Sequence, residues 1–372
     1  MSARLPSSAP AGRYDLKKGF AGTTVLVTGG GGLIGSRIVS RLRQLGSRPI
    51  ALCTLDAYPA EVYRNIFGMQ EGPELVLGDV TDAPLMRRLV SDCDYVIHAA
   101  ALADVAACTR TPGAAITANI LGTQSVLSAA AASERLRRLT FVSSASVYGN
   151  GAEPASADSR AHKAALESVF DRLPVRFRED AGPLDPVSVY ANTKAWGEAQ
   201  TRVLLGDVGT SYSVVRYFSV YGEPQVVKQN SHSWVVAWFS SRAALGLPLH
   251  LHGGGHQIRD LVHVADITEA TLRSLIAPDA HNATVNVGTG VHTSIREVAD
   301  LVLSHFPGVR LMETPMPPGD PLGGYACTRR MEQVLGWRPT ITIAEGVDRY
   351  VRWLQQTPAA LPDWLRTADR AS

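Results

Sequence analysis

The 372-residue chain has few cysteines and almost no net charge, and each shortage excludes a class of protein. Its four cysteines are far apart and form no C-x-x-C pair, so neither a zinc site nor a dithiol redox site is predicted. The formal net charge is +2 and no run of five like charges occurs, which argues against a protein that binds nucleic acid through a basic surface. Isolated cysteines are typical of a reducing compartment, so we expect a cytoplasmic protein.

The sequence also lacks long hydrophobic runs. No stretch has the roughly 18 uninterrupted apolar residues of a membrane span, so no membrane partner is expected. Residues 1–20 are rich in Ser, Ala, Pro and basic residues and lack the apolar core of a secretory signal. We predict that they form a flexible tail or lie on the surface of a partner subunit. Residues 357–372 are predicted to form a second tail.

A turn rich in glycine follows the first short apolar run and precedes an amphipathic stretch. This strand–turn–helix context is the one in which a glycine motif indicates dinucleotide binding. Gly29 permits the tight turn, Gly32 lets the backbone approach a pyrophosphate, and Gly35 lets the helix pack closely on the strand. The helix start at Leu33 and Ile34 then presents N–H groups to the phosphates. Glycine turns also join strands to helices without any ligand, so the motif alone does not decide.

Short apolar runs alternate with amphipathic stretches through the first half of the chain, which is typical of a parallel sheet covered by helices. Together with the glycine turn, this pattern predicts an α/β fold with a doubly wound parallel sheet of the Rossmann type. We assign residues 21–222 to this domain, and residues 259–276 return to it. A smaller C-terminal α/β substrate lobe is predicted over residues 223–258 and 277–356.

Two carboxylates follow the second and third predicted strands. By distance from Gly46, the position that normally holds an acidic residue on the adenosine ribose is Cys53, and Asp56 lies three residues later. Asp56 either reaches the ribose from the loop or is a turn residue. Asp79, followed by Val80, is placed to accept a hydrogen bond from the adenine amino group or to cap a helix.

The fourth predicted strand ends in His98 and three alanines, Ala99, Ala100 and Ala101. Small residues there let the backbone pass close to a flat ligand, and His98 is interpreted as a structural histidine rather than a catalyst. Asn119 begins an alanine-rich helix. Because a buried polar side chain needs partners, Asn119 either ties the neighbouring strand to this helix or is a surface residue.

Hydroxyl side chains and a Y-x-x-x-K motif follow. An apolar run ends in Ser143 and Ser144, which places both at the carboxyl edge of the sheet, where ligands of α/β proteins bind. Tyr190 and Lys194 are four residues apart, so on a helix they share one face. A nearby ammonium favours the phenolate, and a tyrosine tuned in this way can remove or return a hydroxyl proton near neutral pH.

In order and spacing, these motifs resemble the extended short-chain dehydrogenase/reductase family, specifically its NAD-dependent nucleotide-sugar epimerases and dehydratases. The resemblance runs from about residue 24 to about residue 350 and includes the motifs at 215–222, 259–260, 286–288 and 335–337. It implies that Tyr190 is the catalytic base, that Lys194 holds the nicotinamide ribose and lowers the pKa of Tyr190, and that Ser144 hydrogen-bonds the reacting sugar hydroxyl. The reaction would begin with loss of a ring hydroxyl proton, most often at C4, and hydride transfer to NAD⁺.

The resemblance also implies two sets of binding residues. NAD would be bound by the glycine turn, Tyr190, Lys194 and the following positions: Asp56, Asp79, Val80, Ala99, Ala100, Ala101, Asn119, Tyr217 and Ser219. A nucleotide-diphosphate sugar would be bound by Ser144, Ser146, Ser219 and Arg259. Arginine suits the diphosphate because its fork makes two parallel hydrogen bonds to phosphate.

The two positions after Ser144 separate the reactions of this family. The 4,6-dehydratases resemble one another in an Asp-Glu pair there, and uronate decarboxylases keep the Glu, whereas this chain has Ala145 and Ser146. Such a pair is similar to that of 4-epimerases, in which the keto intermediate rotates and takes hydride back on its other face. We therefore predict a C4 epimerase. A carboxylate from elsewhere would make the chain a dehydratase; an NAD(P)H-dependent 4-ketoreductase and a non-enzymatic dinucleotide sensor are the other hypotheses.

Other positions depart from the family pattern. Ser219 stands where Asn is usual, and the second diphosphate arginine expected near residues 318–320 is absent there, which leaves Arg329 and Arg330 as candidates or as surface charges. Apolar residues at helical spacing over 158–173 predict an inserted helix, which forms part of the sugar pocket or packs on the sheet edge. His250, His252 and His256 lie close together in the sequence, but no carboxylate or cysteine completes a set of metal ligands, so no metal site is predicted. The resemblance implies a homodimer formed by the Asn119 and Tyr190 helices.

Overall fold

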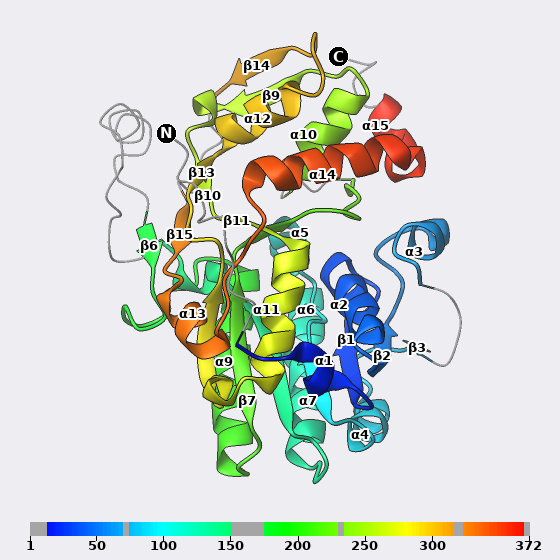
Figure 1. Ribbon diagram of the computed structural model, residues 1–372, viewed down its shortest axis with the longest axis vertical. Coiled ribbons are helices and arrows are strands. Elements are labelled where there is room, and N and C mark those ends of the chain that lie inside the picture. The colour runs from blue at the N-terminus through cyan, green and yellow to red at the C-terminus, as the bar shows by residue number, and fades with distance from the viewer. Residues whose placement is uncertain (1–12, 70–73, 151–174, 230–233, 316–322, 368–372) are drawn as a thin grey trace.

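A computed structural model describes residues 13–69, 74–150, 175–229, 234–315 and 323–367. Its centre is a seven-stranded parallel sheet in the order β12-β7-β5-β4-β1-β2-β3 (Figure 1). The strands are β1 (Thr24–Thr28), β2 (Arg48–Cys53), β3 (Leu75–Leu77), β4 (Tyr95–His98), β5 (Arg138–Ser144), β7 (Tyr212–Tyr217) and β12 (Ala283–Val287). This order, with β1 between β2 and β4, confirms the predicted doubly wound Rossmann sheet.

Helices bury both faces of the sheet. On one face, Val25 and Val27 of β1 share a core with α1 (Leu16–Phe20), α2 (Leu33–Gln44) and α11 (Val264–Ile276). On the other face, Leu26 shares a core with α4 (Ala83–Ser91), α7 (Gly122–Ala131) and α9 (Val189–Asp207). Burial on both faces explains why the strands read as continuous apolar runs rather than as an alternation.

A second hydrophobic core lies in the upper part of Figure 1, above the carboxyl ends of the strands. Its helices are α10 (Val235–Ala244), α12 (Ile295–Leu303) and α14 (Ile343–Gln356), and its strands include β9 (Leu249–His252), which pairs in parallel with β14 (Leu311–Thr314). Val62 and Tyr63 of α3 (Ala60–Asn65) belong to the same core, although α3 follows β2 in the sequence.

Short paired strands connect the two parts of the molecule. They are β6 (Val175–Phe177) with β15 (Gly324–Ala326), β8 (Ser219–Tyr221) with β11 (Leu261–His263), and β10 (Ile258–Arg259) with β13 (Thr293–Ser294). The remaining helices are α5 (Val105–Arg110), α6 (Pro112–Ile116), α13 (Arg329–Leu335) and α15 (Asp363–Thr367). Among the described helices, none combines the length and apolar character that a bilayer span requires.

Three predicted boundaries are wrong. Residues 13–20 are not all tail, because Leu16 and Phe20, one helical turn apart in α1, are buried in the main core. Residues 277–356 are not all substrate lobe, because β12 is the edge strand of the main sheet and α13 packs on the same core. The chain after residue 356 continues into α15, where Leu365 is fully buried. The predicted helix over residues 158–173 lies outside the described residues.

Candidate active site

The glycine turn has the close approaches expected of a dinucleotide cradle. Gly29 has φ +71°, and a Cβ there would lie 2.9 Å from the backbone of Ala100. A Cβ on Gly35 would overlap the carbonyl oxygen of Gly29. The first turn of α2 therefore packs directly on the end of β1, and the N–H groups of Leu33 and Ile34 point out of the helix start at the carboxyl edge of the sheet.

The loops after β2 and β3, where adenosine is predicted to bind, carry carboxylates that accept hydrogen bonds from residues of the same loop. Asp56 is exposed and accepts a hydrogen bond of 2.7 Å from Oγ1 of Thr54, and ribose binding by Asp56 remains a prediction. The usual acidic position, Cys53, lies against Gly31, and burial raises the pKa of its thiol. No carboxylate among the described residues therefore occupies the usual ribose position at the end of β2.

Asp79 forms a similar local turn after β3. Its carboxylate accepts hydrogen bonds of 2.7 Å from both N and Oγ1 of Thr81. Asp82 caps α4 by accepting from the N–H of Leu85 at 2.9 Å. Asp79 is exposed, and Val80 beside it is buried. Adenine binding by Asp79 remains a prediction.

His98 is the structural histidine that the sequence predicts. Its Nδ1 lies 2.8 Å from Oγ1 of Thr28 and its Nε2 lies 2.9 Å from Oγ1 of Thr123, which joins β1, β4 and α7. Burial, reinforced by the charge of Lys194, lowers its pKa to about 3. The imidazole is therefore neutral, and it holds Ala99, Ala100 and Ala101 next to the glycine turn.

Asn119 is buried and joins three elements. Its Oδ1 accepts from the N–H of Leu102 at 2.7 Å, and its Nδ2 donates to the carbonyl of Leu102 and to Oγ1 of Thr193, both at 3.1 Å. It lies in a π-helical turn, Thr117–Leu121, which precedes α7 and which the sequence does not predict. Such turns often mark functional sites, and this one fixes the β4 loop against α9.

The three predicted catalytic residues come together at the end of β5. Tyr190 in the first turn of α9 shares a hydrogen bond with Ser144. Burial raises the pKa of Tyr190 to about 12, and the nearby Cys108 thiol adds to this rise, while the bond to Ser144 opposes it. Among the described groups that shift this pKa there is no carboxylate.

Lys194 is buried one helical turn after Tyr190. Its Nζ donates to the carbonyl oxygen of Val142 at 2.8 Å and lies 5.9 Å from the centre of the Tyr190 ring. Burial lowers its pKa to about 8, although Cys108 and Glu198 oppose the fall. The ammonium is directed at the β5 backbone, and a lowering of the Tyr190 pKa by Lys194 remains a prediction.

A buried polar network lies beneath these residues, and the sequence did not predict it. Glu198, completely buried, accepts hydrogen bonds from Oγ of Ser143 at 2.6 Å and from Nε and Nη2 of Arg216 at 2.8 and 2.6 Å. Nη1 of Arg216 donates to the hydroxyl of Tyr148 at 2.8 Å, which donates to Oδ1 of Asn286 at 2.6 Å. Glu198 is four residues after Lys194, so the helical spacing that joins Tyr190 to Lys194 could have found it.

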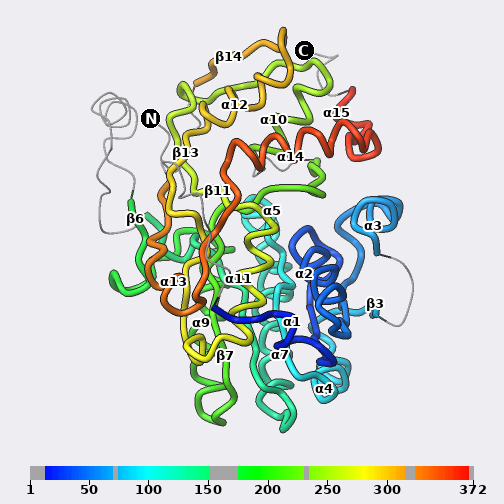
Figure 2. Tube along the Cα trace, in the orientation of Figure 1, coloured from blue at the N-terminus to red at the C-terminus, as the bar shows by residue number. Residues whose placement is uncertain are grey.

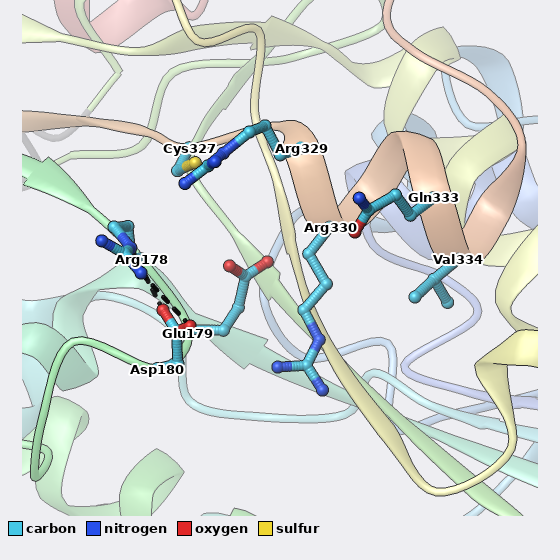
Figure 3. Close-up of a pocket in the computed structure, with 8 residues that line it drawn as sticks. All are labelled: Arg178, Glu179, Asp180, Cys327, Arg329, Arg330, Gln333 and Val334. Atoms are coloured by element: carbon cyan, nitrogen blue, oxygen red, sulfur yellow. Dashed lines mark hydrogen bonds and ion pairs between the residues drawn. The ribbon is translucent and has the colours of Figure 1, made fainter.

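Glu179, which is bonded to Asn286, lines a cavity of about 430 Å³ (Figure 3). The carboxylate of Glu179 accepts from the N–H of Asn286 at 2.8 Å, and burial raises its pKa. Figure 3 shows Glu179 and Arg330 extending into this cavity, which Arg329 also lines. None of the catalytic residues lines it, so the two arginines belong to a place distinct from the reaction centre.

The predicted substrate contacts lie around the end of β5 and the start of the second core. Oγ of Ser146 is buried and has no hydrogen-bond partner among the described residues, and the N–H of Ser146 donates to Oγ of Ser144 at 3.2 Å. Ser219 in β8 donates its N–H to the carbonyl of Asp260 at 2.9 Å. Arg259 donates from Nη1 to the carbonyl of Ile258 at 2.7 Å.

The side chain of Tyr217, a predicted cofactor contact, is bonded within the protein. Its hydroxyl lies 2.6 Å from Oγ1 of Thr271 in α11, and its side chain is buried in the main core. A contact between this residue and a cofactor would therefore involve its backbone at the end of β7. Across the described residues, no three His, Cys, Asp or Glu side chains are grouped as a metal site would require.

The sequence matches the model of the NAD-dependent epimerase/dehydratase family over residues 25–288. The chain belongs to this family. A UDP-glucose 4-epimerase of Mycolicibacterium smegmatis is 30% identical over 89% of this chain and 98% of its own length. A dTDP-glucose 4,6-dehydratase of Streptomyces antibioticus is 29% identical, with coverage of 90% and 93%. The structure of a UDP-glucose 4-epimerase of Thermus thermophilus in complex with NAD matches with a TM-score of 0.74 and 28% identity, over 89% and 99% of the two chains.

The cofactor of the family fits the residues that are present. Gly29 and Gly35 let the turn pack closely on Ala100 and on itself, as a dinucleotide-binding turn requires, and the start of α2 supplies N–H groups of the kind that bind phosphate. Lys194 lies beside β5, where the nicotinamide half would be held. The two relatives have nearly equal identity but different reactions, so the local residues must decide between epimerisation and elimination.

Proposed function

We propose that this protein is an NAD-dependent nucleotide-sugar epimerase that acts at C4. The observation that carries the proposal is the pair Ala145 and Ser146 after the hydrogen-bonded Ser144 and Tyr190. Elimination of water needs an acid for the leaving hydroxyl and a base for the C5 proton. Neither side chain can serve, and the nearby Glu198 is committed to Ser143 and Arg216.

The chain's own residues account for the proton transfers. Ser144 orients the C4 hydroxyl, and Tyr190 takes its proton. NAD, when bound, supplies the hydride acceptor. Because a pKa of about 12 leaves Tyr190 protonated at neutral pH, its base role requires a nearby cation, and Lys194 on the next helical turn is that cation. Tyr190 keeps the proton until the C4 carbon has been reduced from its other face, and then returns it to the oxygen.

The substrate class is a nucleotide-diphosphate sugar. Arg259 supplies positive charge for the diphosphate, and the hydroxyls of Ser219 and Ser146 supply shorter polar contacts. The relative from Mycolicibacterium smegmatis makes UDP-glucose the first substrate to test. Ser146 supports a polar ligand because its buried hydroxyl lacks a partner in the described part of the chain, and such a group usually finds one.

A homodimer in the cytoplasm is the expected form. Ile116, Leu121 and Val203, on neighbouring helical segments, are 46%, 54% and 59% exposed, which is unusual for large apolar side chains unless a second copy covers them. Gln200 of α9 donates to Gln124 of α7 at 2.8 Å, so these helices form one continuous surface. All four cysteines are free thiols, which supports a reducing compartment.

The proposal is tested by releasing small molecules from the purified, denatured protein and by incubating the native protein with UDP-glucose and other nucleotide sugars. We expect NAD in the released fraction and interconversion of a pair of C4 epimers, followed by NMR. A protein that contains no NAD and interconverts no epimers would contradict the proposal. Net consumption of NADPH on a keto-sugar would favour the ketoreductase instead.

A further inference from the structure

Lys228 lies in the chain segment that leads from β8 in the main domain to α10 in the second core. Its side chain is half-buried. The ammonium lies 4.3 Å from the centre of the Tyr58 ring and 5.8 Å from that of Trp234. In the part of the chain that the structure describes, it makes no hydrogen bond or ion pair. A sheltered ammonium without an acceptor is a position that favours an anion.

The segment around Lys228 is packed against the loop that follows β2. Val226 and Val227 share a buried cluster with Val62 and Tyr63 of α3. The ring of Tyr58 packs edge-on against Tyr63 with centroids 5.8 Å apart. Figures 1 and 2 show α3 reaching up from the sheet towards α14 and α15. The second core therefore contacts the chain that follows β2, where adenosine is predicted to bind, and Lys228 lies at this contact.

Two groups that act on Lys228 belong to the loops on either side of the glycine turn. β1 lies between β2 and β4 in the sheet, so the turn after β1 lies between the loops that carry Asp56 and Asp104. Both carboxylates act on Lys228: burial, the largest effect, lowers its pKa, and Asp104 and then Asp56 oppose the fall. Lys228 is thus within electrostatic reach of both loops that flank the glycine turn.

We propose that Lys228 binds the diphosphate of NAD from the side opposite the glycine turn, so that the second core helps to retain the cofactor. The N–H groups at the start of α2 bind one side of the diphosphate, and the ammonium of Lys228 binds the other. This contact compensates for the missing carboxylate at Cys53. The inference depends on NAD binding, which the family shows, and not on the reaction that follows.

The experiment compares Lys228→Met, Lys228→Gln and Lys228→Arg with the unaltered protein. The matched control is Lys18→Met, which removes the same charge from an exposed position on α1. Bound NAD is measured after gel filtration and acid release, and NADH affinity of the cofactor-depleted protein is measured by fluorescence titration. We expect about tenfold weaker NADH binding for the Met and Gln variants, as for loss of one charge-assisted hydrogen bond. The Arg and Lys18→Met proteins should bind NADH like the parent.

The fragments ADP-ribose and adenosine separate a phosphate contact from other effects. Loss of Lys228 should weaken ADP-ribose and leave adenosine unchanged, and the ADP-ribose affinity of the parent should fall more steeply with salt than that of Lys228→Met. Unchanged NADH affinity in folded Met and Gln variants would overturn the proposal. Weaker binding of UDP to the NAD-saturated variant, with unchanged NADH affinity, would also overturn it by assigning Lys228 to the substrate diphosphate. If the parent itself binds no NADH, the proposed function fails first.

Discussion

The predicted NAD site has a reaction half and an adenosine half, and different interactions stabilise the two. In the reaction half, Ser144, Tyr190 and Lys194 rest on a buried network in which the carboxylate of Glu198 and the guanidinium of Arg216 are each bonded several times. In the adenosine half, each carboxylate is satisfied within its own turn. We therefore expect this chain to fix the geometry of the chemistry from below and to hold the adenosine side of the cofactor mainly through backbone and through the second core.

The largest expected effect concerns Tyr190 itself. Tyr190→Phe removes the hydroxyl that takes the proton, so we expect turnover to fall about a thousandfold, the range for loss of a general base. The ring remains, so the content of bound NAD should change little. Turnover is followed by NMR and NAD by acid release. Near-normal turnover in the Phe variant would show that another group is the base.

The buried pair beneath the reaction half is the next target. Glu198→Gln leaves the guanidinium of Arg216 without its charge partner inside the core, so we expect the free energy of unfolding to fall by about 3 kcal/mol. The matched control is Asp348→Asn, which breaks the exposed pair with Arg352 and should cost about 0.5 kcal/mol or less. Denaturant unfolding measures both. Equal losses in the two variants would mean that the network does not support the reaction half.

The titration of Lys194 gives a smaller effect with a definite sign. Its pKa is about 8 in the folded, cofactor-free protein against 10.5 ordinarily, so the unfolded state binds the proton more tightly. Between pH 8 and about 10 the stability of the parent should therefore rise relative to that of Lys194→Met, which cannot titrate. Thermal melts of the cofactor-free proteins over this range measure the difference. Parallel curves would contradict the burial of this ammonium.

The smallest expected effect concerns the adenosine half. Cys53→Asp restores a carboxylate that can accept from the ribose hydroxyls of NAD and repel the extra phosphate of NADP, so preference for NAD over NADP should rise by about fivefold. The control is Asp56→Asn, which should change the affinity for neither NADH nor NADPH, because the Asp56 carboxylate is bonded to Thr54. Fluorescence titration with both reduced cofactors measures the preference. A loss of preference in Asp56→Asn would restore Asp56 to the ribose.

Local patterns predicted much of the fold and part of the site. The glycine turn and the apolar strands are read from consecutive residues, and the Tyr190–Lys194 pair from one helical turn. Glu198 was missed because its partners, Ser143 and Arg216, come from distant strands. The short helix that buries Leu16 and Phe20 was missed because two apolar residues in a polar segment are too few to show a helical spacing. Lys228 was missed because the structure, not the sequence, brings it to Tyr58.

The central claim is that the chain epimerises C4 without elimination, and the fate of the C5 hydrogen tests it most directly. The protein is incubated with UDP-glucose, or with the nucleotide sugar that it accepts, in deuterated water, and the sugar is examined by NMR. An epimerase returns the C4 epimer with its C4 and C5 hydrogens intact, because hydride never leaves the site and no base acts at C5. Deuterium at C5, or a 4-keto-6-deoxy product, would contradict the account.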